Sequence, residues 1–474
     1  MKKKVFLVAS AALLLAACSE SMNDLGEIAP ENAKPTDEKT VVLSPEELCL
    51  IQQIANKTPK ISPEAAQETA MQLLGLQNQT SSLSKKMTAT VFCNKKQVYN
   101  SLTKSYKMED DTAFYVFNTP DEQGFAIVAA DLRVPNQVLA YSDHGSFDPE
   151  TDNPGMALFL EMSKDYVAER IATAEAQEDS LTESICQKLG IKEDSKKENS
   201  LTKVKELMRI PCTTVGLPTI TITSTHIVKP MIKTDWGQEA PYNMKSGEPH
   251  AGCVPVALAQ TLAFWEKPNT LNGYSFNWSI LNNGYPTDAF RDQVSSLIQI
   301  IRTEVHTVGW NTKKNQILPF LRKIGFATNK TQINTYKYND VTNDLDKGRP
   351  VLMIGFEDDE AVGHIWIADG YLKRYGTEKR LIKYCIVEQL DDGTITDRFE
   401  DIMTTSPISY EFLSFNWGWD GDGNGFFLKN TFSTYNRLEK DLYKELTGKS
   451  PKNVNVDFNF NSHLQTITDI YPRK

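Results

Sequence analysis

The sequence predicts an α+β protein with two folded regions. In residues 45–174, two helix starts are followed by strand-type runs and by another amphipathic helix. In residues 225–474, a helix with a buried stripe precedes several apolar runs rich in β-branched residues. The length of 474 residues agrees with this division, because a single domain usually has roughly 100 to 200 residues.

The composition excludes several classes of protein. Apolar residues make up 40% of the chain and charged residues 24%, which is ordinary for a soluble folded protein and unlike a disordered one. The formal net charge of −10 argues against nucleic acid as a partner, because nucleic-acid-binding proteins need a basic face. Seven cysteines are too few for a disulfide-rich scaffold, and their odd number leaves at least one thiol unpaired.

Residues 1–18 are typical of an export signal. Three lysines precede an apolar run, 5–17, which is too short to span a bilayer as a helix. The run ends in Leu15-Ala16-Ala17-Cys18, which resembles the lipobox of bacterial lipoproteins. On that resemblance Cys18 would carry the lipid anchor and become the mature N-terminus; the alternative is an ordinary secretory signal with a chance cysteine. The polar residues 19–44 predict a tether.

The first folded region, residues 45–174, begins with two helix signals. Ser44-Pro45-Glu46-Glu47 has a cap serine, a proline at the first position and acids in the first turn, and Ser62-Pro63-Glu64 repeats the pattern. The later elements are expected as strands at 113–117, 124–130 and 138–141, with a hairpin turn between the first two, and as a helix at 156–172.

Residues 175–224 predict a charged linker between the two regions. Residues 175–209 carry charges of both signs and few aromatics, so either a solvated helix or a flexible connector is expected there. Exposed connectors are where proteases cut, so the processing site is expected in this linker. In the second region, strands are expected at 350–356, 364–368 and 383–387.

Cys253 is the first candidate catalytic residue. It follows a glycine and begins a helix that runs to about Trp265, and Pro255 fixes the helix start because proline is tolerated only in a first turn. The positive end of the helix dipole and the free backbone N–H groups favour the thiolate, which is the form that attacks. The alternative is a buried, unreactive thiol, which is how most free cysteines behave.

His364 is the second candidate. It stands just after a glycine at the start of an apolar strand, which suits the base of a Cys/His pair assembled from two separate elements. A lone histidine on a strand is otherwise usually a packed core residue. Further along the chain, Asn416 and Trp417 could orient and shield an imidazolium.

Together these segments resemble the active site of the streptopain-like family of papain-fold cysteine peptidases. The segment around Gln238 resembles the stretch near the start of that family's mature enzyme, and 114–118, 124–131 and 140–147 resemble its inhibitory propeptide. The resemblance implies a papain-like cysteine peptidase catalytic domain at 225–474, preceded by a smaller α+β inhibitory prodomain at 45–174.

The resemblance also implies a role for each site residue. Cys253 would be the nucleophile and His364 the general base and acid, with Gln238 donating to the oxyanion beside the Cys253 backbone N–H. Trp417 and Trp419 would pack over the histidine, and Asn416 is the candidate for orienting it. His250, His306 and Asp369 lie near these motifs but are assigned no catalytic role.

Two features depart from the family pattern, and a third imitates a calcium-binding motif. Pro255 stands where a small helix former is usual, and 298–326 lacks the expected Gly/Ser-rich stretch, which affects specificity more than catalysis. Residues 420–425 copy the opening of a calcium loop, but the twelfth position, which needs a bidentate glutamate, is Thr431. The sequence therefore predicts no metal site and no cofactor.

The predicted function is that of a secreted, lipid-anchored cysteine endopeptidase made as a zymogen. Its partners would be protein or peptide substrates, its own prodomain as an intramolecular inhibitor, and a membrane through Cys18. The expected location is the bacterial cell envelope, at the outer membrane or cell surface, with release of the catalytic domain after processing. Two alternatives remain: a binding or adhesion module on the same scaffold with weak or no hydrolysis, and a thiol acyltransferase.

Overall fold

A computed structural model describes most of the chain between residues 40 and 473. The described residues are 40–56, 58–74, 88–100, 105–119, 122, 124–148, 150, 153–189, 214–216, 218–309, 311–327, 333–356, 363–389, 395–432 and 464–473. The predicted signal peptide, Cys18, most of the predicted tether and Cys212 lie outside these ranges. No helix within them has the length and apolar character needed to cross a membrane.

The N-terminal half, residues 40–189, combines three main helices with an antiparallel sheet in the order β2-β3-β4-β5. Both helix starts lie where the sequence predicts them. Ser44 and Glu47 form a capping box, in which each side chain binds the other's backbone N–H at 3.1 and 2.6 Å. The elements are β1 (Thr40–Val42), α1 (Pro45–Asn56), α2 (Pro63–Leu74), β2 (Thr88–Asn100), β3 (Ser105–Asn118), β4 (Phe125–Ala129), β5 (Val138–Ser142) and α3 (Pro154–Leu189).

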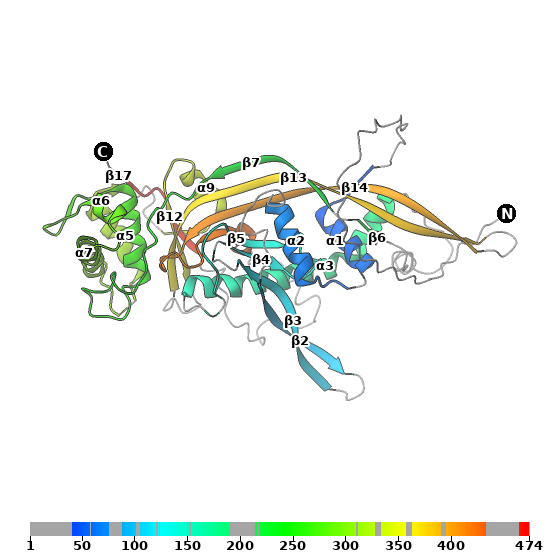
Figure 1. Ribbon diagram of the computed structural model, residues 1–474, viewed down its shortest axis with the longest axis horizontal. Coiled ribbons are helices and arrows are strands. Elements are labelled where there is room, and N and C mark those ends of the chain that lie inside the picture. Colours follow the sequence, from blue (N-terminus) through cyan, green and yellow to red (C-terminus); the bar gives the residue numbers. More distant parts are fainter. Residues whose placement is uncertain are drawn as a thin grey trace, which may run out of the picture.

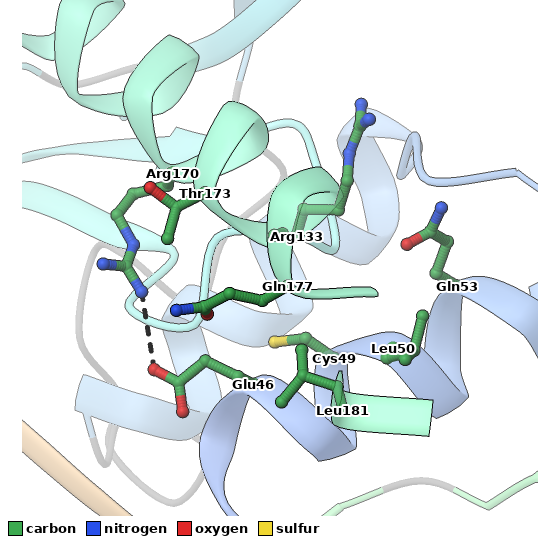
Figure 2. A pocket seen from close by; sticks show the side chains of 10 residues that line it. Glu46, Cys49, Leu50, Gln53, Arg133, Arg170, Thr173, Gln177 and Leu181 are labelled. Carbon is green, nitrogen blue, oxygen red and sulfur yellow. Dashed lines mark hydrogen bonds and ion pairs between the residues drawn. The ribbon is translucent and has the colours of Figure 1, made fainter. Parts of the chain in front are cut away.

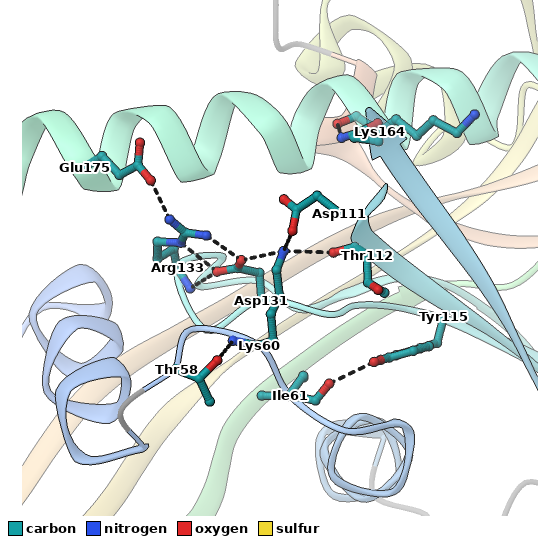
Figure 3. Close-up of polar contacts among 11 residues, drawn as sticks. Thr58, Lys60, Ile61, Asp111, Thr112, Tyr115, Asp131, Arg133, Lys164 and Glu175 are labelled. Atoms are coloured by element: carbon teal, nitrogen blue, oxygen red, sulfur yellow. Dashed lines mark hydrogen bonds and ion pairs between the residues drawn. The ribbon is translucent and has the colours of Figure 1, made fainter. Parts of the chain in front are cut away.

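A buried carboxylate ties these elements together (Figure 3). Asp131, just after β4, is fully buried and accepts from Arg133 Nε and Nη2 at 2.8 and 2.7 Å and from Lys60 Nζ at 3.0 Å. Arg133 also reaches Glu175 of α3 at 2.5 Å. Because a buried charge is costly unless it is paired, this network fixes the loop after β4 against α3.

Helix α3 is longer than predicted. The sequence suggested a helix over 156–172 and left 175–209 open between a solvated helix and a flexible connector, and the structure continues α3 to Leu189. The physical reason is packing, since Thr182, Ile185 and Cys186 are buried in this second part. Residues 175–189 are therefore helix and not connector.

The C-terminal half, residues 214–473, has a helical part and a sheet part (Figure 1). The helices α5, α6 and α7 gather at one end of the molecule, and a long β13–β14 hairpin extends away from them. The helical part contains α5 (Cys253–Trp265), β8 (Thr270–Leu271), β9 (Tyr274–Ser275), α6 (Trp278–Asn283), α7 (Asp288–Glu304), η2 (Lys314–Gln316), α8 (Ile317–Lys323), β10 (Phe326–Ala327) and β17 (Tyr471–Pro472).

In the sheet part, the predicted strands at 364–368 and 383–387 are one strand, β13, which pairs with β14 along almost its whole length. The elements of the sheet part are β6 (Thr214–Val215), β7 (Thr219–Val228), β11 (Asn334–Thr335), α9 (Tyr338–Leu345), β12 (Val351–Phe356), β13 (Gly363–Gln389), β14 (Ile395–Asn416), β15 (Gly425–Leu428), η3 (Lys429–Phe432) and β16 (Gln465–Ile467).

The two halves share one sheet. β15 pairs with β5, with Phe426 opposite Tyr141, so the path runs from β11 in the C-terminal half to β2 in the N-terminal half. The predicted linker residues 219–224 are also part of it, because β7 pairs antiparallel with β13. The end of the predicted tether contributes as well, since β1 pairs with β14. The halves are therefore joined by backbone hydrogen bonds as well as by the chain itself.

Candidate active site

Cys253 is the first residue of helix α5, as predicted. Gly252 before it has a φ of 91°, a conformation that favours glycine, and it places the thiol at the open N-terminal end of the helix. Burial raises the pKa of the Cys253 thiol, and backbone hydrogen bonds from Ile365, Val254 and Cys253 itself lower it in part. The helix N-terminus thus supplies N–H groups to the sulfur, as the thiolate form requires.

The contact with Ile365 brings Cys253 to the start of β13, where His364 lies. His364 is only 4% exposed, and its Nε2 lies 3.2 Å from the carbonyl oxygen of Trp417. A carbonyl can only accept, so Nε2 carries the proton and Nδ1 presents a lone pair. Nδ1 is buried and makes no hydrogen bond, so the Cys253–His364 hydrogen bond is not formed in this structure.

The environment of His364 keeps its imidazole neutral. Burial lowers its pKa to about 4, and the hydrogen bond to Trp417 opposes this only in part. Two indoles contribute to the burial, because the His364 ring centroid lies 6.0 Å from that of Trp366 and 6.5 Å from that of Trp417. Trp417 is itself fixed, since its Nε1 donates to the Gly423 carbonyl at 3.0 Å.

Trp419 and Asn416 were also expected near His364. Trp419, expected over His364, stacks on His250 with a centroid distance of 5.9 Å. The Asn416 side chain makes three hydrogen bonds, none of them to His364. Its Oδ1 accepts from Gln260 Nε2 and from the Gly418 N–H, each at 3.0 Å, and its Nδ2 donates to the Thr234 carbonyl at 2.9 Å.

Gln238 lies beside the loop that precedes Cys253. It is buried, and its carbonyl accepts from the Ala251 N–H at 2.7 Å, two residues before Cys253. The preceding Gly237 packs closely against Asp420, because a Cβ there would lie 2.0 Å from Oδ2 of that side chain, which would have to move. The predicted residues Gln238, Cys253, His364 and Trp417 are thus brought into one region.

Two buried residues that the motifs did not indicate hold this region together. Gln260 accepts through Oε1 from Thr234 Oγ1 at 2.9 Å and from the Trp236 N–H at 3.1 Å, while its Nε2 binds Asn416. Gln260 and Thr261 are the polar residues in an otherwise apolar run of α5, which is a signal that sequence reading could have used.

Arg302 of α7 is the second such residue. It is 5% exposed and donates to the carbonyls of His250, Ala251 and Gly309, which braces the loop that precedes Cys253. The available signal in the sequence was its spacing, since Arg302 follows Val294 and Ile298 at intervals of four along the apolar stripe of the helix.

The turn at 420–425, which copies a calcium loop, serves as scaffold here. Asn424 accepts from the Trp417 N–H at 2.9 Å and donates to Asp235 at 3.1 Å. Burial raises the pKa of Asp420 to about 6, with Glu239 and Asp235 adding to the effect. Within the described ranges, His, Cys, Asp and Glu side chains form no group suited to a metal ion.

The N-terminal half covers the site through the first turn of α3. Gly155 approaches so closely that a Cβ on it would lie 2.9 Å from Cδ2 of His364 and 2.4 Å from Cε3 of Trp417. Asn153 caps this turn, with Oδ1 3.0 Å from the Gly155 N–H, and donates to the Asp422 carbonyl at 3.3 Å. Sequence reading missed Gly155, and its place one residue after the helix-starting Pro154 was the only cue.

Comparison with known proteins agrees with this arrangement. Residues 58–167 match the family described as Spi protease inhibitor, and residues 236–297, which include Gln238 and Cys253, match the Peptidase C10 family. The thiol protease/hemagglutinin PrtT of Porphyromonas gingivalis is 21% identical over 388 residues, which are 72% of this chain and 37% of that protein. The chain thus spans little more than a third of the length of this relative. No solved structure matches the chain. The resemblance read from the sequence is confirmed: a segment similar to the Spi protease inhibitor family precedes a segment similar to the Peptidase C10 family, the streptopain family.

Proposed function

We propose that this chain is the zymogen of a papain-like cysteine endopeptidase. The observation that supports this most directly is the arrangement around His364. Its Nε2 is held by a carbonyl, its lone pair at Nδ1 is unused, and the next residue in the chain binds the Cys253 sulfur. A neutral imidazole fixed in this tautomer is a general base that lacks only contact with its nucleophile.

The reaction follows from these positions. His364 Nδ1 takes the proton of Cys253, and the thiolate attacks the peptide carbonyl. The backbone N–H of Cys253 and the side chain of Gln238 stabilise the oxyanion. The imidazolium then protonates the leaving amine, and a thioester remains on Cys253. Water, deprotonated by His364, hydrolyses the thioester and restores the thiol.

The N-terminal half acts as the inhibitory prodomain. Gly155 lies against His364, so the N-terminal half adds to the burial that lowers the pKa of this histidine. Burial also raises the pKa of the Cys253 thiol. Both shifts disfavour the thiolate–imidazolium pair. Release of α3 from this face is therefore the activating step, with cleavage between Leu189 and Thr214 separating the halves.

The location proposed is the bacterial cell envelope. The lipobox-like segment ending in Cys18 supports a lipid anchor, and 21 residues then lead to β1 at Thr40. Labelling with a radioactive fatty acid tests this directly, because Cys18→Ala would abolish incorporation and the neighbouring Ser19→Ala would not.

A second candidate function is adhesion or binding, which the name of the PrtT relative favours, since that protein is called both a protease and a hemagglutinin. The two functions differ in whether they need the Cys253 thiol. A binding module would keep its ligand affinity in Cys253→Ala, whereas the peptidase would lose all turnover.

The deciding experiment measures peptide hydrolysis and labelling by a thiol-directed electrophile, before and after maturation. We expect the mature form to hydrolyse peptides and to label at Cys253, and Cys253→Ala and His364→Ala to do neither. Cys385→Ala, at another cysteine of the C-terminal half, is the matched control and should behave as wild type. Equal labelling of wild type and Cys253→Ala would overturn the peptidase assignment. Mass spectrometry of the products separates hydrolysis from acyl transfer to an amine.

A further inference from the structure

The N-terminal segment Thr40–Asn56 makes a second contact with the C-terminal half, at the distal part of the β13–β14 hairpin. We call this segment, which comprises β1 and α1, the clasp. β1 pairs in parallel with β14, with Val41 opposite Thr404, and the Leu43 N–H continues the pattern to the Thr405 carbonyl at 2.9 Å. The clasp therefore occupies an edge that β14 would otherwise leave open.

A separate apolar cluster lies beneath the clasp. Leu43 and Ile185 are completely buried in it, so the clasp and the end of α3 bury each other's apolar side chains. The hairpin supplies the third side through Ile382 and Ile402, which are 5% and 3% exposed. The cluster consists of Val41, Leu43, Leu48, Leu50, Ile51, Ile185, Ile382 and Ile402.

Ion pairs and hydrogen bonds connect the clasp to α3. Glu47 is 3% exposed and accepts from Ser184 Oγ and from Lys188 Nζ, each at 2.6 Å. Figure 2 shows a second contact across the gap between α1 and α3, where Arg170 faces Glu46 at 3.4 Å. The Glu47 carboxylate is buried, whereas Lys188 is exposed and Ser184 half-buried, so its loss would remove the acceptor that holds these two α3 side chains on α1.

The clasp lies far from the active-site contact. α3 carries Gly155 in its first turn and Lys188 in its last, and its 36 residues span roughly 54 Å at 1.5 Å per residue. The same rigid helix is thus held at both ends. Because the clasp and the Gly155 contact are linked through α3, each keeps the other's partner at a high effective concentration. While one contact holds, dissociation of the other is therefore quickly reversed. The clasp residues also lie outside both segments that match known families, 58–167 and 236–297.

We propose that the distal β13–β14 hairpin is a docking surface for the clasp, and that this contact retains the prodomain on the catalytic half after the connection between Leu189 and Thr214 has been cut. Cleavage and release are then separate steps. Proteolysis or displacement of the clasp governs the second step. The inference rests on the proposed function only in naming the N-terminal half a prodomain, because retention itself requires no catalysis.

The test uses the full-length chain with Cys253→Ala, so that it cannot process itself, and with a recognition sequence for an added site-specific protease inserted between Leu189 and Thr214. After the cut, native mass spectrometry and size-exclusion chromatography report whether the two pieces stay together. The dissociation rate is followed with a fluorophore on one piece. Val41→Asp is compared with Val42→Asp, its neighbour on β1, because Val41 is 6% exposed and Val42 is 64% exposed.

We expect the cut wild-type and Val42→Asp proteins to remain associated, and Val41→Asp to dissociate roughly 10-fold faster or more, since an aspartate would be buried in the apolar cluster. If Val41→Asp does not fold, Glu47→Gln replaces it in the test. It keeps the side-chain size and loses the ion pair with Lys188, so it should also accelerate dissociation. Equal rates for Val42→Asp and the folded clasp variants would overturn the proposal. So would separation of the wild-type pieces at once upon cutting. None of these readouts depends on peptidase activity, so failure of the proposed function would be seen separately.

Discussion

Gly155 of α3 lies directly against His364, and only the absence of a side chain at Gly155 permits the approach. A Cβ on Gly155 would be 2.9 Å from Cδ2 of His364 and 2.4 Å from Cε3 of Trp417, closer than real Cβ atoms come to their neighbours. The contact with His364 is therefore made by the backbone of α3 at Gly155, while the Met156 side chain packs against Gly423 nearby. A larger side chain at residue 155 should consequently change the reactivity of Cys253 in the full-length chain more than the rate of the mature enzyme.

Gly155→Ala should weaken latency. The added methyl group cannot fit against Trp417, so the first turn of α3 must move away from His364. The full-length variant should therefore label at Cys253 with a thiol-directed electrophile faster than full-length wild type, while the mature forms label equally. Ala157→Leu adds bulk at an exposed position of the same turn and should leave the labelling rate unchanged. Slow labelling of Gly155→Ala would show that this contact does not control access.

The pKa of His364 should rise when the prodomain leaves. Burial holds it at about 4 in the covered state, against an ordinary value near 6.5. The unfolded chain binds more protons than the folded one between these values, so burial of His364 costs stability increasingly as pH falls from about 6.5 to 4 and has no effect above that window. NMR titration of His364 in full-length and mature Cys253→Ala measures the change, and equal pKa values in the two forms would contradict it.

Gln238→Ala should slow turnover without unfolding the protein. Loss of one oxyanion donor lowers kcat by about 100-fold or more where it has been measured. Gln238→Glu tests the same idea at nearly constant size, because an ionised carboxylate cannot donate a hydrogen bond, and it should show a similar loss. Steady-state kinetics and thermal melts of both mature variants give the answer. A wild-type kcat in Gln238→Ala would show that Gln238 does not stabilise the oxyanion.

The local elements could be predicted from the sequence, because their signals are local. Pro45, Pro63 and Pro255 each mark the first turn of an observed helix, and glycine before Cys253 fits its positive φ. The length of β13 could not be predicted in this way. Its middle, around Lys373 and Glu378, is polar and is held as strand by pairing with β14 and β7, which are distant in sequence.

The same distinction applies to the site. Cys253 and His364 could be proposed from their types and local context. Trp417 was expected to shield His364, but its backbone carbonyl also orients the ring, and a backbone acceptor leaves no signature in the sequence. The covering contact was hidden for a similar reason, because Gly155 acts through having no side chain.

Asn416→Ala should lower the free energy of unfolding and leave the pKa of His364 nearly unchanged. The change removes the partners of Gln260 Nε2, the Gly418 N–H and the Thr234 carbonyl, all within a buried network. Each unsatisfied buried group costs about 1 to 3 kcal/mol, so the free energy of unfolding should fall measurably in denaturant titration. The acidic limb of the kcat/KM profile of the mature enzyme should keep its pKa. A shifted limb with unchanged stability would instead show that Asn416 orients His364 directly in the mature form.

Arg302 should act as a positioning residue for the nucleophile. Its guanidinium binds the carbonyls of His250, Ala251 and Gly309, and the first two belong to the loop that sets the direction of Cys253 and of its backbone N–H. Arg302→Met removes these bonds, and the resulting misplacement should lower kcat per titrated active site by roughly 10- to 100-fold. Arg302→Lys keeps the charge and should restore part of the loss.

Active-site titration decides between positioning by Arg302 and general support of the fold. A purely structural residue would lower the fraction of titratable Cys253 and the melting temperature, but each remaining site would turn over at the wild-type rate. Arg291→Met is the matched control, because Arg291 lies on the same helix, is exposed, and pairs only with Asp288 one turn away among the contacts described. It should leave kcat and titration unchanged. Wild-type kcat per active site in Arg302→Met would assign Arg302 to the fold and leave the orientation of Cys253 to Gly252 and the start of α5 alone.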